Sequence, residues 1–283
     1  MRRVVKHGVK HGVKQQVRSL RVQHGQAITE FIVIAPLLLF FCFATVQFVL
    51  LYQAKATLDV ATLEAARAGA VSHGSMAAMQ DALARGLAPL YARHADGEGM
   101  QAALQRAQTD AARYSSIAIV NPTRDMIADF AQPRLSASDG VSHDEIPNDT
   151  LMYRNPSPGM RSRVSIQDAN LLKIRVHYCY DMYVPLVNKV VYYAVNVIGN
   201  VAPNGLFARE PADAGSDAYG APRRPDTLCR IKLADGIETS RWPLAVESEA
   251  IVRMQSPYRT EAAHDLDSST RAADAAAPAG ERR

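Results

Sequence analysis

The stretch that decides the fold is Gly25–Tyr52, with the sequence GQAITEFIVIAPLLLFFCFATVQFVLLY. No charged side chain occurs between Phe31 and Ala54. A helix rises about 1.5 Å per residue, so roughly 20 apolar residues are enough to cross a hydrocarbon core of ~30 Å. Phe31–Leu51 supplies that length, and we therefore predict a membrane-spanning helix.

A cleaved secretory signal is the competing interpretation of this stretch. The apolar core of such a signal is typically about 7 to 15 residues long and ends in a cleavage site of small residues. No such site follows Leu51. The next residues, QAKATLDVATLEAARAGAV at 53–71, keep helical spacing and favour helix. We therefore expect one helix that continues out of the membrane.

The charges that flank the apolar run predict its orientation. Residues 1–24 carry seven basic and no acidic side chains, which by the positive-inside bias places the N-terminus in the cytoplasm. These seven exceed the net charge of +4, so the remaining chain has a net charge of −3 and shows no basic surplus for nucleic acid. The basic residues are Arg2, Arg3, Lys6, Lys10, Lys14, Arg18 and Arg21.

Glu30 stands at the edge of the apolar run and has two interpretations. In one, its carboxylate lies in the headgroup zone, where the helix dipole favours an anion by ~0.3–1 kcal/mol. In the other, the basic leader, Gly25 and the Glu30-Phe31 pair resemble the processing pattern of type IV prepilins. The longer stretch GQAITEFIVIAPLLLFFCFATVQF, followed by AKATLDVATLEAARAGA, resembles the TadE-like pseudopilins of tight-adherence (Flp) pilus machines.

The resemblance implies a processing site, a location and partners. A prepilin peptidase would cut after Gly25, so that Gln26 becomes the new N-terminus and Glu30 and Phe31 open the mature helix. The protein would be a minor pseudopilin, anchored once in the inner membrane with its C-terminal domain in the periplasm. Its partners would be other pilin-like subunits and the pilus assembly platform.

Beyond the span, the patterns predict an α+β domain in which helices pack on a small antiparallel sheet. A stripe of mostly small residues from Ala54 to Ala68 favours packing against the protein's own sheet, with packing against another subunit as the alternative. We expect helices at 76–94 and 100–114, and strands at 117–120, 171–180 and 244–255. Residues 185–199 fit helix and strand equally well.

The remaining segments predict loops and a tail. Residues 131–170 are expected to form long loops that include the polar residues His143, Asp144 and Glu145, with a short strand at 151–154. The predicted parts are a leader (1–25), a transmembrane helix (26–54), a helical segment (55–115), a periplasmic α+β part with long loops (116–256) and a disordered tail (257–283).

The cysteines suggest one crosslink. Cys42 lies in the span, whereas Cys179 and Cys229 would both lie in an oxidising compartment, where disulfides persist. We expect Cys179 on the polar face of its strand, available to the segment that carries Cys229. A bridge there would stabilise the fold by roughly 4 kcal/mol through loop entropy.

No motif in the sequence points to catalysis. The sequence contains no GxSxG, HExxH, GxxxxGK[ST] or CxxC pattern, and its histidines do not recur at ligand spacing. We expect no enzyme activity, no cofactor and no metal. The alternative function is an unprocessed, membrane-anchored periplasmic hydrolase or ligand-binding protein.

Overall fold

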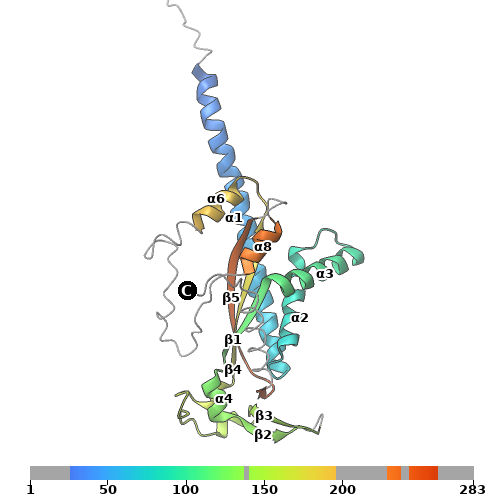
Figure 1. Cartoon of the computed structure of the whole chain (residues 1–283), viewed down its shortest axis with the longest axis vertical. Coiled ribbons are helices and arrows are strands. Elements are labelled where there is room, and N and C mark those ends of the chain that lie inside the picture. Colours follow the sequence, from blue (N-terminus) through green and yellow to red (C-terminus); the bar gives the residue numbers. More distant parts are fainter. Residues whose placement is uncertain (1–25, 137–139, 196–227, 237–241, 261–283) are drawn as a thin grey trace, which may run out of the picture. The chain divides into compact units, whose positions relative to one another are not determined.

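The computed structural model describes residues 26–136, 140–195, 228–236 and 242–260, with side chains from Glu30 onward. It has the α+β architecture that the sequence predicts: a long apolar N-terminal helix, shorter helices and two small antiparallel sheets (Figure 1). The chain divides into two compact units at Cys42–Phe43. The second unit holds the sheets and the other helices.

Helix α1 (Gln26–Val71) is one continuous helix, in agreement with the sequence prediction. It ends where His73 and Gly74 adopt positive φ angles of 58° and 80°. A left-handed residue just past the last turn is a common way to stop a helix. Gly74 adopts this conformation without steric cost, because it has no Cβ atom.

Two further helices follow, and their ends differ from the predicted ones. Helix α2 (Met76–Leu87) gives way to the 3-10 turn η1 (Ala88–Leu90), because Pro89 cannot continue an α-helix. Helix α3 (Gly97–Tyr114) begins earlier than expected, because the Asp96 side chain caps it by accepting a hydrogen bond of 2.7 Å from the Gly99 N–H.

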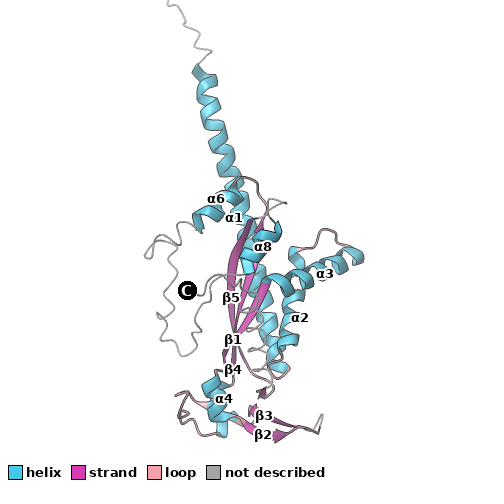
Figure 2. Cartoon of the chain, viewed as in Figure 1, coloured by secondary structure: helices cyan, strands magenta, loops and turns pink. Residues whose placement is uncertain are grey.

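The larger sheet has the order β1-β4-β5, with both pairs antiparallel. Strand β1 (Ser115–Asn121) pairs with β4 (Leu171–Met182), and β4 pairs along its whole length with β5 (Trp242–Arg253). The strands lie where the sequence predicts them, and β5 alternates in burial, whereas β4 buries most residues of both faces. Figure 2 shows them beside helices α1, α2 and α3, whose buried residues form one core with one face of this sheet.

The smaller sheet, in the order β2-β3-β6, was not predicted. Strands β2 (Gln132–Leu135) and β3 (Ser142–Ile146) lie in the segment expected to be loops, and β6 (Tyr258–Arg259) lies in the predicted tail. The loop prediction is therefore wrong at these positions. Their side chains are mostly polar, so period two in apolar residues, on which strand prediction rests, is missing.

Short helical elements correct one prediction, settle one open alternative in part and add elements that were not predicted. Residues 151–154 form no strand, because Leu151–Tyr153 is the 3-10 turn η2. Val187–Tyr193 is helix α6, which resolves the ambiguity at its own residues. Helix α8 (Leu228–Gly236) was missed, and α4 (Arg124–Phe130) and α5 (Ile166–Ala169) complete the described elements. Residues 196–227 and the part of the predicted tail from 261 on lie outside the described residues.

Candidate functional site

The predicted processing residues lie at the beginning of α1. Gly25 is outside the described residues, and Gln26 is the first residue of the helix. Glu30 and Phe31 stand on the second turn, and both side chains are exposed. The accessible position of this segment suits recognition by another protein.

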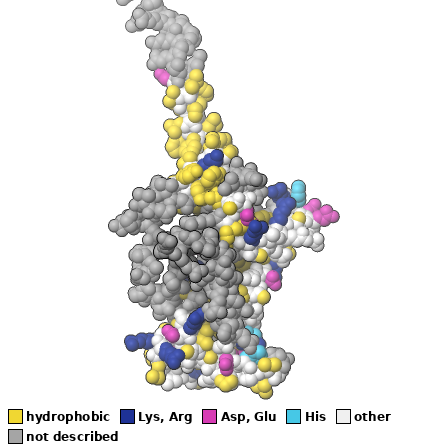
Figure 3. Space-filling model, in the orientation of Figure 1, with side chains coloured by type: hydrophobic (Ala, Val, Ile, Leu, Met, Phe, Trp, Pro, Cys, Tyr) yellow, Lys and Arg dark blue, Asp and Glu magenta, His cyan; other side chains and the backbone are white. Residues whose placement is uncertain are grey.

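The N-terminal half of α1 exposes apolar side chains on all sides. Twelve large apolar residues between Phe31 and Val49 are exposed. Figure 3 shows hydrophobic side chains covering this part of the helix. Within the described residues, one helix, Glu30–Val71, is long and apolar enough to cross a membrane. A helix that is hydrophobic all round requires lipid or other helices around it.

The C-terminal half of α1 instead buries one narrow face. Ala54, Leu58, Ala61 and Ala65 are buried in the core of the domain, so the stripe that the sequence shows packs on the protein's own domain. The approach of α2 is close, because a Cβ atom added at Gly86 would lie 2.6 Å from both Ala61 Cα and Ala61 Cβ. Small residues at this crossing allow the two helix backbones to come together.

Gln47 marks the change between these two halves. Its side chain is 1 % exposed, although it stands within the apolar run. Its Oε1 accepts a hydrogen bond of 3.0 Å from the backbone N–H of Val184, in the connection between β4 and α6. A buried amide is stabilised by such a partner, and the bond ties this connection to α1.

Cys179 and Cys229 are joined by a disulfide in the structure, with their Cα atoms 5.3 Å apart. The bridge attaches α8 to β4. We expected Cys179 on the polar, solvent-exposed face of its strand, and this is wrong, because the residue is fully buried. Helix α8 packs beside β4, β5 and α3. The alternation of residues in β4 cannot predict this packing, because it says nothing about a distant helix.

Lys232 of α8 joins a buried polar cluster. Its Nζ donates to Asp110 Oδ2 of α3 at 3.0 Å and to the Cys179 carbonyl at 2.7 Å, and it lies 3.5 Å from Asp181 Oδ2. Burial, together with the Asp110 charge, raises the pKa of the Tyr178 hydroxyl, which also donates to Asp110 at 3.0 Å. We conclude that the cation and the hydroxyl hold the Asp110 carboxylate between three elements.

The same region contains the one group of metal-ligand atoms found among the described residues. Atoms of His177, Cys179 and Cys229 lie within 4.8 Å of one another. In the structure the two sulfurs are bonded to each other, and His177 Nδ1 lies 3.4 Å from Glu247 Oε1. A thiolate, not a disulfide sulfur, is the metal-ligating form of cysteine, so the arrangement functions here as a crosslink.

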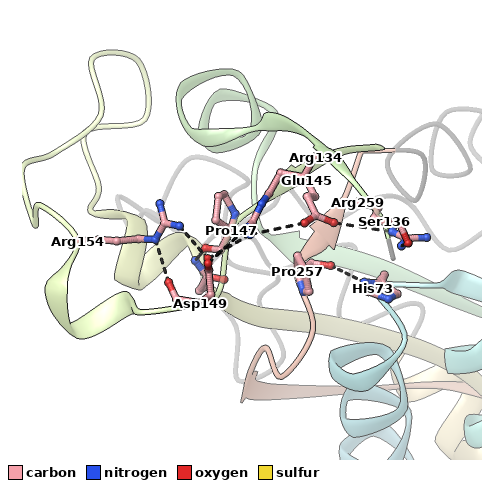
Figure 4. Close-up of polar contacts among 10 residues, drawn as sticks. His73, Arg134, Ser136, Glu145, Pro147, Asp149, Arg154, Pro257 and Arg259 are labelled. Atoms are coloured by element: carbon pink, nitrogen blue, oxygen red, sulfur yellow. Dashed lines mark hydrogen bonds and ion pairs between the residues drawn. The ribbon is translucent and has the colours of Figure 1, made fainter. Parts of the chain in front are cut away.

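A second polar cluster holds the smaller sheet together (Figure 4). Glu145 of β3 lies 3.9 Å from Arg134 of β2 and 3.9 Å from Arg259 of β6. The hydrogen bond from Arg154 lowers the pKa of Asp149 most, burial opposes it, and the hydrogen bond and charge of Arg134 add to the lowering. His143, Asp144 and Glu145 lie in strand β3, with His143 and Glu145 buried, so the expectation that they belong to a long loop is wrong.

Comparisons with known proteins identify one match. The family model described as TadE-like protein matches residues 25–67. No curated protein and no solved structure matches the chain. The match covers the expected processing segment from Gly25 on, the exposed apolar half of α1 and most of the small-residue stripe.

Proposed function

We propose that this chain, whose residues 25–67 match the family model described as TadE-like protein, is a minor pseudopilin in the assembly of a tight-adherence pilus or a related secretion apparatus. One observation carries the proposal. The matched residues include a helix whose first half is apolar on every side and whose second half packs one face on its own domain. Such a helix suits a subunit held in lipid that later packs with similar helices.

The proposed location is the inner membrane. In it, α1 spans the bilayer once, with the basic leader in the cytoplasm and the domain from α2 onward in the periplasm. The oxidising conditions of that compartment are consistent with the Cys179–Cys229 disulfide. A reporter that is active only outside the cytoplasm should function when fused after Thr260 and fail when fused within residues 1–20. The reverse pattern would exclude this orientation.

The proposed role is structural and not enzymatic. The inner membrane, other pilin-like subunits, the assembly platform and a prepilin peptidase are the expected partners, and nucleic acid is not. Cleavage after Gly25 would create an α-ammonium at Gln26, near the carboxylate of Glu30 and near lipid. Charges in such surroundings are costly unless they are paired, and a neighbouring subunit can supply the opposite charge.

N-terminal sequencing of the membrane-bound chain tests the proposal. In cells that express a prepilin peptidase, the mature chain should begin at Gln26, and Gly25→Ala should leave the precursor uncut. Glu30→Val should still be cleaved but should be poorly incorporated into the assembled complex. A chain that keeps its leader in such cells would support the plain membrane anchor of the alternative function and overturn the proposed one.

A further inference from the structure

The segment from Tyr183 to Val195, which contains α6 and which we call the α6 segment, contacts α1 near the end of its apolar run. The backbone N–H of Val184 donates to Gln47 Oε1. Gln47 lies four residues before Leu51, where the predicted span ends. At about 1.5 Å per residue, this contact lies roughly 6 Å inside the end of the span.

The outer face of the α6 segment is apolar and exposed. Tyr183, Leu186, Val190 and Tyr193 are each at least half exposed, with fractions of 60 %, 68 %, 50 % and 54 %. Val190 and Tyr193 are three residues apart and share one face of α6, and Leu186 immediately precedes the helix. Val187 and Asn188 of α6 are buried.

Helix α1 also exposes apolar side chains at this level. Phe48, Val49 and Tyr52 are exposed within about one and a half turns of Gln47. Large apolar side chains are thus exposed both on α1 and on the segment that is hydrogen-bonded to it, and such surfaces mark contact with a partner or a membrane. Because this level lies at the end of the candidate span, lipid is the chemistry that would cover them.

The aromatic and lysine residues in and beside the α6 segment are of the types found at the boundary between hydrocarbon and headgroups. Tyr192 and Tyr193 pack on Trp242, with ring centroids 5.0 Å and 5.7 Å apart, and Lys189 Nζ lies 5.7 Å from the centroid of the Trp242 ring. Tryptophan and tyrosine are enriched at membrane interfaces, where one part of the ring is apolar and another is wet. Lysine contributes there by keeping its ammonium among the headgroups.

We infer that the α6 segment lies in the outer interface of the bilayer that α1 spans, with Leu186 and Val190 in the acyl boundary and the aromatic residues at headgroup level. The inference rests on the membrane span of the proposed function, but not on cleavage or assembly. Interfacial segments of this kind bury their apolar face about 5–10 Å into the boundary. This second contact with lipid would fix the height and tilt of the domain on the membrane.

Trp242 provides the measurement, because it is the only tryptophan of the chain. The full chain is reconstituted in vesicles of phosphatidylcholine and phosphatidylglycerol whose acyl chains carry bromine either near the carbonyls or near the methyl ends. We expect the shallow bromines to quench Trp242 fluorescence at least about twofold more than the deep ones, as the depth of an interfacial segment requires. Absence of quenching by either lipid would overturn the inference.

Paired variants separate lipid contact from a general effect of charge. Leu186→Glu with Val190→Glu should abolish most of the shallow quenching. Met152→Glu with Tyr153→Glu, at two residues that are each 89 % exposed in η2, should leave it unchanged. Equal quenching in both pairs would also overturn the inference.

Alkaline carbonate extraction of the same vesicles tests the membrane span separately from the position of the α6 segment. A chain that remains in the vesicles without Trp242 quenching overturns only the position of the α6 segment. A chain that is released overturns the span, and with it both this inference and the proposed function.

Discussion

Gly86→Ala tests the helix crossing that connects α1 to its domain. The added Cβ would lie 2.6 Å from Ala61 Cα, whereas ordinary contact begins at 3.4 Å, so the two helices must separate locally by 0.8 Å. The atoms it meets belong to the backbone and to a Cβ, which cannot rotate away. Such overpacking costs about 1–3 kcal/mol.

The same substitution also stabilises α2 through the higher helix propensity of alanine, and this gain offsets part of the cost of the clash. Alanine is favoured over glycine inside a helix by about 0.5–1 kcal/mol. We therefore expect the free energy of unfolding to fall by about 1–2 kcal/mol in Gly86→Ala, because the clash exceeds the gain in helix propensity. Gly97→Ala is the matched control, since a Cβ at Gly97 meets nothing within 4 Å. This variant should be unchanged or slightly more stable.

Denaturant unfolding of the full chain in detergent micelles, followed by Trp242 fluorescence, measures both variants. A change in the midpoint at constant slope reports the stability difference. If Gly86→Ala is as stable as Gly97→Ala, then α1 and α2 do not approach as closely as the structure shows. In that case the small-residue stripe would need another partner.

Three further outcomes are expected. Lys232→Met should lose about 3–5 kcal/mol in the same unfolding assay, because Asp110 and Asp181 lose their shared buried cation, while Lys55→Met at an exposed pair should change little. Thiol labelling of the unfolded, unreduced chain should modify Cys42 alone, and labelling of all three cysteines would exclude the disulfide. Burial of Glu249 opposes ionisation, but hydrogen bonds from Arg175 and Lys173 outweigh it and lower its pKa below 4.5. The carboxylate therefore stabilises the fold above pH 4.5, and this stability is lost as the pH falls through the lowered pKa. Glu249→Gln should make the unfolding midpoint less sensitive to pH in that window, and an unchanged profile would contradict the assignment.

The parts of the fold that the sequence predicts are those whose signal is local and apolar. Strand β4 shows strict alternation, and β5 follows the same rule, so both are recognised without knowing their partner. Helix α1 follows from its length and from the absence of charge between Phe31 and Ala54. In these elements the apolar pattern along the chain is enough to predict the type of element, although not the burial of every residue in it.

The missed parts depend on contacts between distant residues. Strand β3 is recognised only through its pairing with β2 and β6, the last more than a hundred residues away. Burial of Cys179 depends on α8, which lies fifty residues further along the chain. The contact between Gln47 and Val184 joins residues 137 positions apart, and nothing near Gln47 in the sequence indicates it.

The exposed half of α1 connects the proposed membrane location with the proposed assembly. Burial of one large apolar side chain is worth about 1.5–3 kcal/mol, so the twelve exposed between Phe31 and Val49 represent on the order of 20–35 kcal/mol. This exceeds the stability of a whole domain, which is about 5–15 kcal/mol. Water therefore cannot surround this helix at any stage. In the proposed function, the helix must pass from lipid directly into contact with other apolar helices, so extraction from the membrane and incorporation into the assembly must occur as one coupled step.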